Sequence, residues 1–328
     1  MTRELAVAVE RFPIFGTFTI ARGSRTEAVV VTATIRDGAA TGRGECVPYA
    51  RYGETVDGVA AAIRDVAGRV AAGMSRSELQ EAMPAGAARN AVDCALWDLE
   101  AKLTGVPAHV AAGIDRIGPA TTAYTISLGS PAEMAEGAAK AAGRPILKIK
   151  LGGPDGDVER IAAVRRAAPD ATLIADANEG WTAANLETHL AACAAAGFAL
   201  IEQPVPAAED EILARIRHDV PICADESLHE RGDLARLRGR YDAINIKLDK
   251  AGGLTEALAL ASQAQALGFT IMVGCMLGTS LAMAPAFLLT PSARFVDLDG
   301  PLLLAADREP GLSFEGSLVR PPSPALWG

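Results

Sequence analysis

Charged side chains recur at one place in a repeated pattern along the second half of this chain. Short apolar runs of strand-like residues each end near a charged residue. Parallel strands of a closed barrel are buried on both faces, so a charge at the carboxyl end of such a strand points into the barrel mouth, where barrel enzymes keep their sites. Five neighbouring runs supply, in order, Lys148 and Lys150, Asp176, Glu202, Asp225 and Lys247.

Three of these charges are carboxylates on consecutive runs. Converging at one mouth, they would repel one another and raise each other's pKa values. A hard divalent cation removes that conflict, and an oxygen-only set without His or Cys favours Mg²⁺. Any one acid alone fits a structural salt bridge better, but the three together predict that Asp176, Glu202 and Asp225 bind one Mg²⁺ per subunit.

The lysines flank this triplet in sequence, so a barrel places Lys150 and Lys247 on opposite sides of it. A lysine beside a metal in a partly dry mouth has a lowered pKa and can act as a base near neutrality. A substrate carboxylate neutralised by the metal has a more acidic alpha proton. Removal of that proton by one lysine and return from the other would invert the carbon, which is racemisation or epimerisation. The alternative is that both lysines only neutralise the acids.

Eight apolar runs must position these residues. A residue near each run's end recurs every 22 to 27 residues, at Thr125, Lys150, Asp176, Glu202, Asp225, Lys247, Gly274 and Asp297. This spacing is typical of one strand, one helix and two loops, and eight such units predict a β/α barrel. The alternative, an open doubly wound sheet, would gather catalytic groups at one crevice instead of on successive strands.

The first 110 or so residues have a different texture, with strands followed by helices. Residues 27–36 are rich in β-branched side chains and read as a strand, and Asp37-Gly38 indicates a hairpin turn. Helical patterns follow around 55–72 and 87–103. We therefore predict an α/β protein, a modified TIM barrel with an N-terminal α+β capping domain completed by the C-terminal segment. The predicted ranges are 1–115 for the capping domain with an active-site loop at about 15–27, 116–305 for the barrel, and 306–328 for the return.

Composition narrows the partners. The net charge of −9 over 328 residues argues against nucleic acid, and no apolar run is long enough to span a bilayer. Without a signal-peptide pattern we expect a cytoplasmic protein that binds a small molecule, and its composition is compatible with a homo-oligomer. The five cysteines are expected to be reduced core thiols, and the four histidines show no metal-ligand spacing.

These motifs resemble the muconate-lactonizing subgroup of the enolase superfamily over the whole chain. The matching residues are Lys148-Ile149-Lys150, Asp176-Ala177-Asn178, Glu202-Gln203-Pro204, Ala224-Asp225-Glu226-Ser227 and Asn245-Ile246-Lys247. The resemblance implies that Lys150 and Lys247 are the acid/base pair, that Lys148 contacts the substrate carboxylate, and that the reaction passes through an enediolate. This agrees with the Lys and Mg²⁺ chemistry known for the superfamily.

Within the subgroup, Asp297-Leu298-Asp299 resembles a D-x-D motif of the dipeptide epimerases, in which the two aspartates bind the substrate ammonium. The resemblance also implies that an arginine of the N-terminal loop, Arg22 or Arg25, binds the acidic side chain of a dipeptide such as L-Ala-D/L-Glu. The alternative for these aspartates and arginines is that they are solvated and do not contact substrate. Thr125 and Cys275 complete the predicted substrate-binding set. We interpret Trp181 as packing and Lys250 as a surface or loop charge.

Other functions remain open at this point. A cycloisomerase, an o-succinylbenzoate synthase or an N-acylamino acid racemase would use the same lysines and metal. A Schiff-base aldolase leaves the acidic triplet unexplained, and a metal-binding barrel without activity leaves the lysine pair unexplained.

Overall fold

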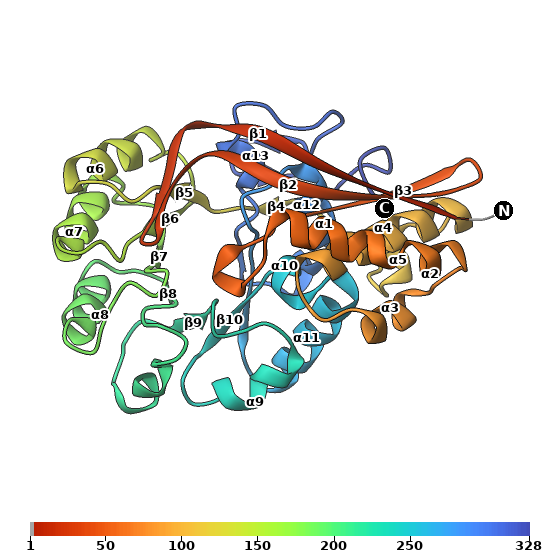
Figure 1. Cartoon of the computed structure of the whole chain (residues 1–328). Helices are drawn as coiled ribbons and strands as arrows, with labels where there is room; N and C mark the ends of the chain where they lie inside the picture. The colour runs from red at the N-terminus through yellow and green to blue at the C-terminus, as the bar shows by residue number, and fades with distance from the viewer. Residues whose placement is uncertain (1–2) are drawn as a thin grey trace.

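The computed structural model describes residues 3–328, and its centre is an eight-stranded parallel sheet whose strands lie side by side in chain order (Figure 1). The Ala123 N–H donates to the Val296 carbonyl at 2.8 Å, which joins the first strand segment to the last and closes the barrel. The predicted runs form strands β5 (Tyr124–Ile126), β6 (Ile146–Lys150), β7 (Thr172–Asp176), β8 (Leu200–Glu202), β9 (Ile222–Ala224), β10 (Ala243–Ile246), β11 (Thr270–Val273) and β12 (Phe295–Val296).

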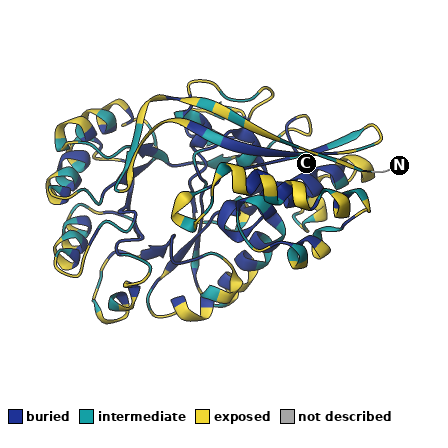
Figure 2. Ribbon diagram, in the orientation of Figure 1, coloured by how far each residue is buried: buried dark blue, intermediate teal, exposed yellow. Residues whose placement is uncertain are grey.

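Helices cover the outside of the barrel, and their inner faces are buried against the strands (Figure 2). At the start of the first helix Ser130 forms a capping box with Glu133, and Pro131 occupies the first turn. The α-helices are α6 (Pro131–Lys140), α7 (Asp157–Ala167), α8 (Leu186–Ala195), α9 (Leu234–Leu237), α10 (Leu248–Ala251), α11 (Leu254–Ala266), α12 (Ser280–Ala286) and α13 (Gly300–Leu303). Short 3₁₀ segments modify the repeat, with η2 (Asp210–Arg215) after β8 in place of an α-helix, η3 (Arg231–Asp233) and η4 (Phe287–Ser292).

The N-terminal part is an antiparallel three-stranded sheet covered by helices. Its strands are β1 (Glu4–Ile20), β2 (Gly23–Asp37) and β3 (Ala40–Cys46), and its helical segments are η1 (Ala50–Tyr52), α1 (Val56–Asp65), α2 (Ala67–Ala71), α3 (Arg76–Ala82), α4 (Ala87–Thr104) and α5 (Ala108–Ala111). Helix α4 packs directly on β3 because Gly42 and Gly44 have no side chain. A Cβ on Gly44 would lie 2.1 Å from the Ala91 carbonyl.

The segment expected to be an active-site loop is instead the tip of the β1–β2 hairpin, which reaches over the barrel mouth (Figure 1). The two strands pair up to Ile20 and Gly23, so only Ala21 and Arg22 form the turn. A register shift between Pro13 and Phe18 bends the ribbon. The tip rests on the barrel through a hydrogen bond from the Leu128 N–H to the Thr19 carbonyl at 3.0 Å.

The C-terminal residues return to the N-terminal part. Strand β14 (Leu318–Val319) pairs with β13 (Phe314–Glu315) on one side and with β4 (Ala120–Thr121) on the other. The Trp327 indole donates to the Cys94 carbonyl of α4 at 3.0 Å. Among the residues described, no helix is both long enough and apolar enough to cross a membrane.

Candidate active site

One cavity lies at the carboxyl ends of the barrel strands, beneath the hairpin tip. Both predicted catalytic lysines line it, and so do all predicted substrate-binding residues: Lys148, Asp297, Asp299, Arg22, Arg25, Thr125 and Cys275. The predicted metal ligand Asp225 also lines the cavity, whereas Asp176 and Glu202 lie deeper and are fully buried. The sequence-predicted residues therefore meet in one place.

Strand register brings the three carboxylates together. Asp176 at the end of β7 pairs directly with Glu202 at the end of β8, and Asp225 follows β9. Burial raises the pKa of Glu202 to about 7, and the negative charge of Asp176 adds to the effect. Burial also opposes ionisation of Asp176, but the ammonium groups of Lys150 and Lys148 outweigh it and lower the Asp176 pKa.

Lys148 lies among the acids with its side chain buried. Its Nζ is 2.7 Å from Glu202 Oε2, 2.8 Å from Asp297 Oδ2 and 3.1 Å from Asp176 Oδ2. Burial would lower the pKa of Lys148, but the surrounding carboxylates outweigh burial and raise it well above the usual value. Lys148 is therefore an ammonium that bridges the metal-ligand candidates and the Asp297 end of the cavity.

The two candidate bases contact different carboxylates. Lys150 Nζ lies 2.6 Å from Asp176 Oδ2, and Lys247 Nζ lies 2.7 Å from Asp225 Oδ2. The lysines thus approach the acidic triplet from opposite ends, as β6 and β10 flank the three acidic strands. Burial would lower the pKa of Lys247, but Asp225 and Glu202 outweigh burial and raise that pKa.

Asp176, Glu202 and Asp225 are the candidate ligands for a hard cation. Within residues 3–328 no three His, Cys, Asp or Glu side chains are spaced to hold a metal ion, and the ammonium groups of three lysines contact the acids. The chemistry of the donors still fits. Only carboxylates are present, and Glu202 Oε2 accepts no hydrogen bond although it lies 2.7 Å from the Lys148 ammonium. The other oxygen, Oε1, is fixed by the Asn245 amide at 2.8 Å.

The interpretation of Lys250 as a surface or loop charge is wrong. Its side chain is buried, and Nζ lies 2.6 Å from Asp225 Oδ1 and donates to the Asp225 and Asn245 carbonyls. Helix α10 begins immediately after Lys247, and residues three apart on a helix share a face, so Lys250 turns towards the same acid. That spacing was the signal available in the sequence.

The far end of the cavity carries the two acids of the D-x-D motif. Asp299 accepts the Thr125 N–H at 2.7 Å, and burial together with the charge of Asp297 raises its pKa to about 7. Asp297 Oδ2 accepts a hydrogen bond from the Lys148 ammonium, whereas the buried Oδ1 has no hydrogen-bond partner among the described residues. A buried carboxylate oxygen without a donor is rare and fits a site for a positively charged ligand group.

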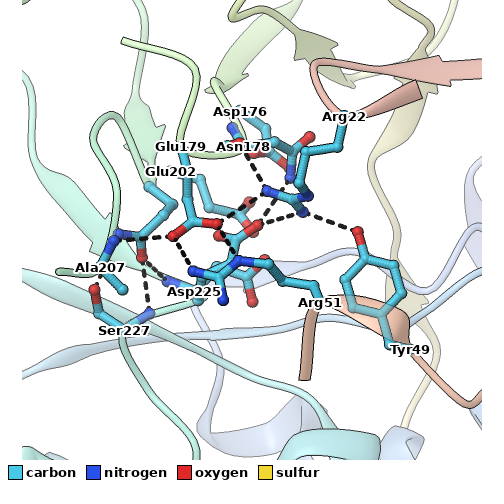
Figure 3. A network of polar contacts seen from close by, with 12 residues as sticks. Arg22, Tyr49, Arg51, Asp176, Asn178, Glu179, Glu202, Ala207, Asp225 and Ser227 are labelled. Atoms are coloured by element: carbon cyan, nitrogen blue, oxygen red, sulfur yellow. Dashed lines mark hydrogen bonds and ion pairs between the residues drawn. The ribbon is translucent and has the colours of Figure 1, made fainter. Parts of the chain in front are cut away.

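The two arginines of the hairpin tip differ in their partners, and Figure 3 shows the contacts of Arg22. The Arg22 guanidinium donates to the Asn178 carbonyl at 2.7 Å, to the Tyr49 hydroxyl at 2.9 Å and to Glu226 Oε1 at 2.6 Å. Arg25 lines the cavity and lies over the Tyr49 ring at 5.4 Å, and its side chain forms no hydrogen bond or ion pair with residues 3–328. The Arg22 guanidinium is therefore already hydrogen-bonded to the protein, whereas the Arg25 guanidinium is available to bind a ligand.

Other sequence expectations concern packing. Trp181 is fully buried, and its indole donates to Asp157 Oδ2 at 2.7 Å, so it supports the loop after β7. The cysteines are all free thiols, four of them buried and Cys275 partly exposed at the cavity. Sequence reasoning missed the contacts of Glu226, Asn178 and Tyr49 with Arg22, although Asn178 and Glu226 stand inside the motifs beside Asp176 and Asp225.

The chain is similar to known proteins over nearly its whole length. Residues 2–111 match the mandelate racemase / muconate lactonizing enzyme N-terminal domain, and residues 131–322 match the enolase C-terminal domain-like family. The L-Ala-D/L-Glu epimerase of Escherichia coli K12 is 49% identical over 95% of this chain and 98% of its own. The N-acetyl-D-glutamate racemase of a Pseudoalteromonas species is 44% identical over 91% of this chain and 95% of its own.

Solved structures give the same grouping. A crystal structure of an enolase family member from Agrobacterium tumefaciens, with bound sodium and L-Ala-L-Glu, is 61% identical, covers 99% of this chain and 100% of its own, and has a TM-score of 0.98. The dipeptide epimerase of Cytophaga hutchinsonii, complexed with Mg and D-Ala-L-Val, is 29% identical over 98% of this chain and 94% of its own, with a TM-score of 0.89. This chain therefore belongs to the enolase superfamily, in the family of mandelate racemase and muconate lactonizing enzyme.

Proposed function

We propose that this protein is a Mg²⁺-dependent dipeptide epimerase that acts on L-Ala-D/L-Glu. The observation that carries the proposal is the placement of Lys150 and Lys247. Both line one cavity, and they contact acids at opposite ends of the carboxylate triplet. Two lysines facing one carbon from opposite sides can remove a proton on one face and return one on the other. Inversion at the alpha carbon follows from this arrangement.

The unpaired oxygen of Asp297 supports a substrate with a free ammonium. Asp297 Oδ1 is buried without a partner, and Asp299 lies beside it with a pKa raised to about 7 by burial and by Asp297. An ammonium placed here would supply the missing donor and would favour ionised Asp299. Lys148, which contacts Asp297 and the metal-ligand candidates, would hold the substrate carboxylate at the other end.

Arg25 is the proposed partner of the acidic side chain at the second residue. Arg22 already binds Asn178, Tyr49 and Glu226, whereas Arg25 lines the cavity without a polar partner among the described residues. A guanidinium in this position can form two parallel hydrogen bonds to a carboxylate. Arg22 would instead hold the hairpin tip over the site, and the tip in this position would exclude water.

Asp176, Glu202 and Asp225 would hold the cation, one Mg²⁺ per subunit. When bound, Mg²⁺ would neutralise the substrate carboxylate and so stabilise the enediolate. Lys150 and Lys247 each contact one of these acids, so binding of the cation would weaken both ion pairs and leave the amino groups available for proton transfer.

One specific observation favours a second candidate, an N-acylglutamate racemase, because the Pseudoalteromonas relative is an N-acetyl-D-glutamate racemase with 44% identity. Such a substrate keeps the glutamate but lacks the ammonium. Its amide has no charge to offer Asp297 and Asp299.

The test compares three substrates under one set of conditions: L-Ala-D-Glu, its N-acetyl derivative and N-acetyl-D-Glu. The proposal predicts rapid epimerisation of the free dipeptide. It also predicts a loss of about thirtyfold or more in kcat/KM for each acetylated compound, since a buried charged contact is worth about 2–5 kcal/mol. Equal or faster turnover of N-acetyl-D-Glu would favour the second candidate.

A further inference from the structure

The main chain at the end of β8 leaves the regular sheet pattern. Up to this point β8 and β9 form a parallel ladder, in which the Gln203 N–H donates to the Cys223 carbonyl at 2.9 Å. The next bond of such a ladder would run from the Asp225 N–H to the Gln203 carbonyl. Gln203 instead has φ 35°, and its carbonyl accepts the Glu179 N–H from the β7 side at 2.9 Å.

The Gln203 side chain takes the place of the carbonyl that turned away. Its Oε1 accepts the Asp225 N–H at 2.9 Å and the Ser227 N–H at 3.1 Å. Both backbone amides belong to the segment that carries Asp225, which is drawn together with Ser227 in Figure 3. A side chain on β8 thereby sets the position of the main chain at the end of β9.

The orientation of this amide is fixed by its other partners. Nε2 donates to the Val205 carbonyl at 2.9 Å, and also to the Ser227 and Tyr241 hydroxyls, each at 3.0 Å. Both hydroxyls contact Asp210 Oδ2 and can donate to it, so they accept from Gln203. Gln203 is fully buried and does not line the cavity, so it cannot touch a substrate.

A left-handed backbone conformation in a residue other than glycine is strained. Within the described part of the chain such residues occur only at Asn178, Glu179 and Gln203, just after Asp176 and Glu202. The strain therefore lies at the two strand ends that carry metal-ligand candidates.

We propose that Gln203 is a positioning residue that fixes Asp225 relative to Glu202 through its side-chain carbonyl, and so sets the spacing of the cation site. The proposal rests on the proposed function only in taking Mg²⁺ as the cation. Glu202 precedes Gln203 directly, and the Gln203 amide holds Asp225 across the gap between the strands. Lys247 and Lys250 also bind Asp225, but Gln203 is the residue that links its main-chain N–H to β8. Loss of the side-chain carbonyl would remove that link and leave two buried N–H groups without an acceptor.

The test measures Mg²⁺ binding by calorimetry, without any dipeptide, for the wild type and for Gln203→Met, Gln203→Glu and Tyr241→Phe. Gln203→Met removes the acceptor of Asp225 and Ser227. Tyr241→Phe is the matched control, because it removes hydrogen bonds to the same amide and to Asp210 but leaves Oε1 in place. Thermal unfolding of each protein is followed alongside.

We expect Gln203→Met to bind Mg²⁺ about 10- to 100-fold more weakly than the wild type, in line with other residues that orient metal ligands. Tyr241→Phe should unfold at a lower temperature yet keep its Mg²⁺ affinity. Gln203→Glu should also keep it, because a carboxyl group buried beside Asp210 is protonated, so that one oxygen accepts as Oε1 does and the other donates in place of Nε2. A folded Gln203→Met with wild-type affinity would overturn the proposal. If that variant does not fold, a Gln203→Glu protein with strongly weakened affinity overturns it.

The outcome can be separated from that of the proposed function. Absence of Mg²⁺ binding in the wild type would contradict the proposed cofactor. Binding in the wild type with no change in a folded Gln203→Met would contradict the role of Gln203 alone.

Discussion

Asp249→Asn should make the stability of this protein less dependent on pH. Asp249 lies in α10 of the barrel, and its Oδ1 accepts the Val47 N–H at 2.9 Å and the Asn90 amide at 3.0 Å from the N-terminal part. Burial raises its pKa to about 7; the two hydrogen bonds oppose this, and the charges of Glu54 and Glu45 add to the rise. The side chain therefore stays protonated in the folded protein over a range in which it ionises after unfolding.

The sign follows from proton binding. An unfolded aspartate titrates near pH 4, so between about pH 4 and pH 7 the folded state holds a proton that the unfolded state has lost, and the free energy of unfolding falls as pH rises. Each pH unit costs about 1.4 kcal/mol, so the wild type loses about 3 kcal/mol between pH 5 and pH 8 through this one group. Asparagine is isosteric, keeps the acceptor for Val47 and Asn90, and does not titrate.

The assay is urea unfolding of the wild type, Asp249→Asn and the control Asp170→Asn at pH 5 and pH 8. The exposed Asp170 controls for a change of charge alone. We expect the stability of Asp249→Asn relative to the wild type to rise by about 3 kcal/mol from pH 5 to pH 8, while that of the control stays unchanged. A difference that is the same at both pH values would refute the reasoning.

Three further predictions follow from the site. Asp176→Asn, Glu202→Gln and Asp225→Asn should each abolish turnover and weaken Mg²⁺ binding in calorimetry, and full activity in excess chelator would contradict the metal assignment. Arg25→Gln should lower kcat/KM for Ala-Glu by about tenfold or more but leave Ala-Leu unaffected, whereas Arg22→Gln should lower both; equal losses for the two substrates in Arg25→Gln would argue against its role. Lys250→Met should lower the free energy of unfolding by about 3 kcal/mol, because it leaves part of the buried Asp225 charge uncompensated, and wild-type stability in urea would count against this.

Most of the fold could be predicted from the periodic spacing of apolar runs in the sequence. The regular spacing of apolar runs predicted all eight barrel strands, because this signal is local in the chain. The hairpin tip was predicted as a loop, since pairing of residues 18–20 with 23–25 depends on tertiary support from the barrel, such as the bond from Leu128 to Thr19.

The site residues were predictable where chemistry coincides with strand ends. Lys150, Asp176, Glu202, Asp225 and Lys247 stand at such ends, and the structure brings them together. Partners that come from distant segments were not predictable. Whether Arg22 or Arg25 is free depends on contacts with residues more than 150 positions away, as in the bond from Arg22 to Asn178. The Gln203 side chain accepts hydrogen bonds in place of its main-chain carbonyl because of the positive φ angle of this residue, and the residue type alone does not predict that angle.

Proton exchange in D₂O tests the central claim, inversion by two opposed lysines, most directly. Proton NMR would follow the alpha proton of glutamate in L-Ala-L-Glu and in L-Ala-D-Glu with the wild type, Lys150→Ala and Lys247→Ala. The account predicts exchange of both isomers by the wild type, of one isomer only by Lys150→Ala, and of the other isomer only by Lys247→Ala, with no epimerisation by either variant. Exchange of both isomers by a single-lysine variant would contradict it.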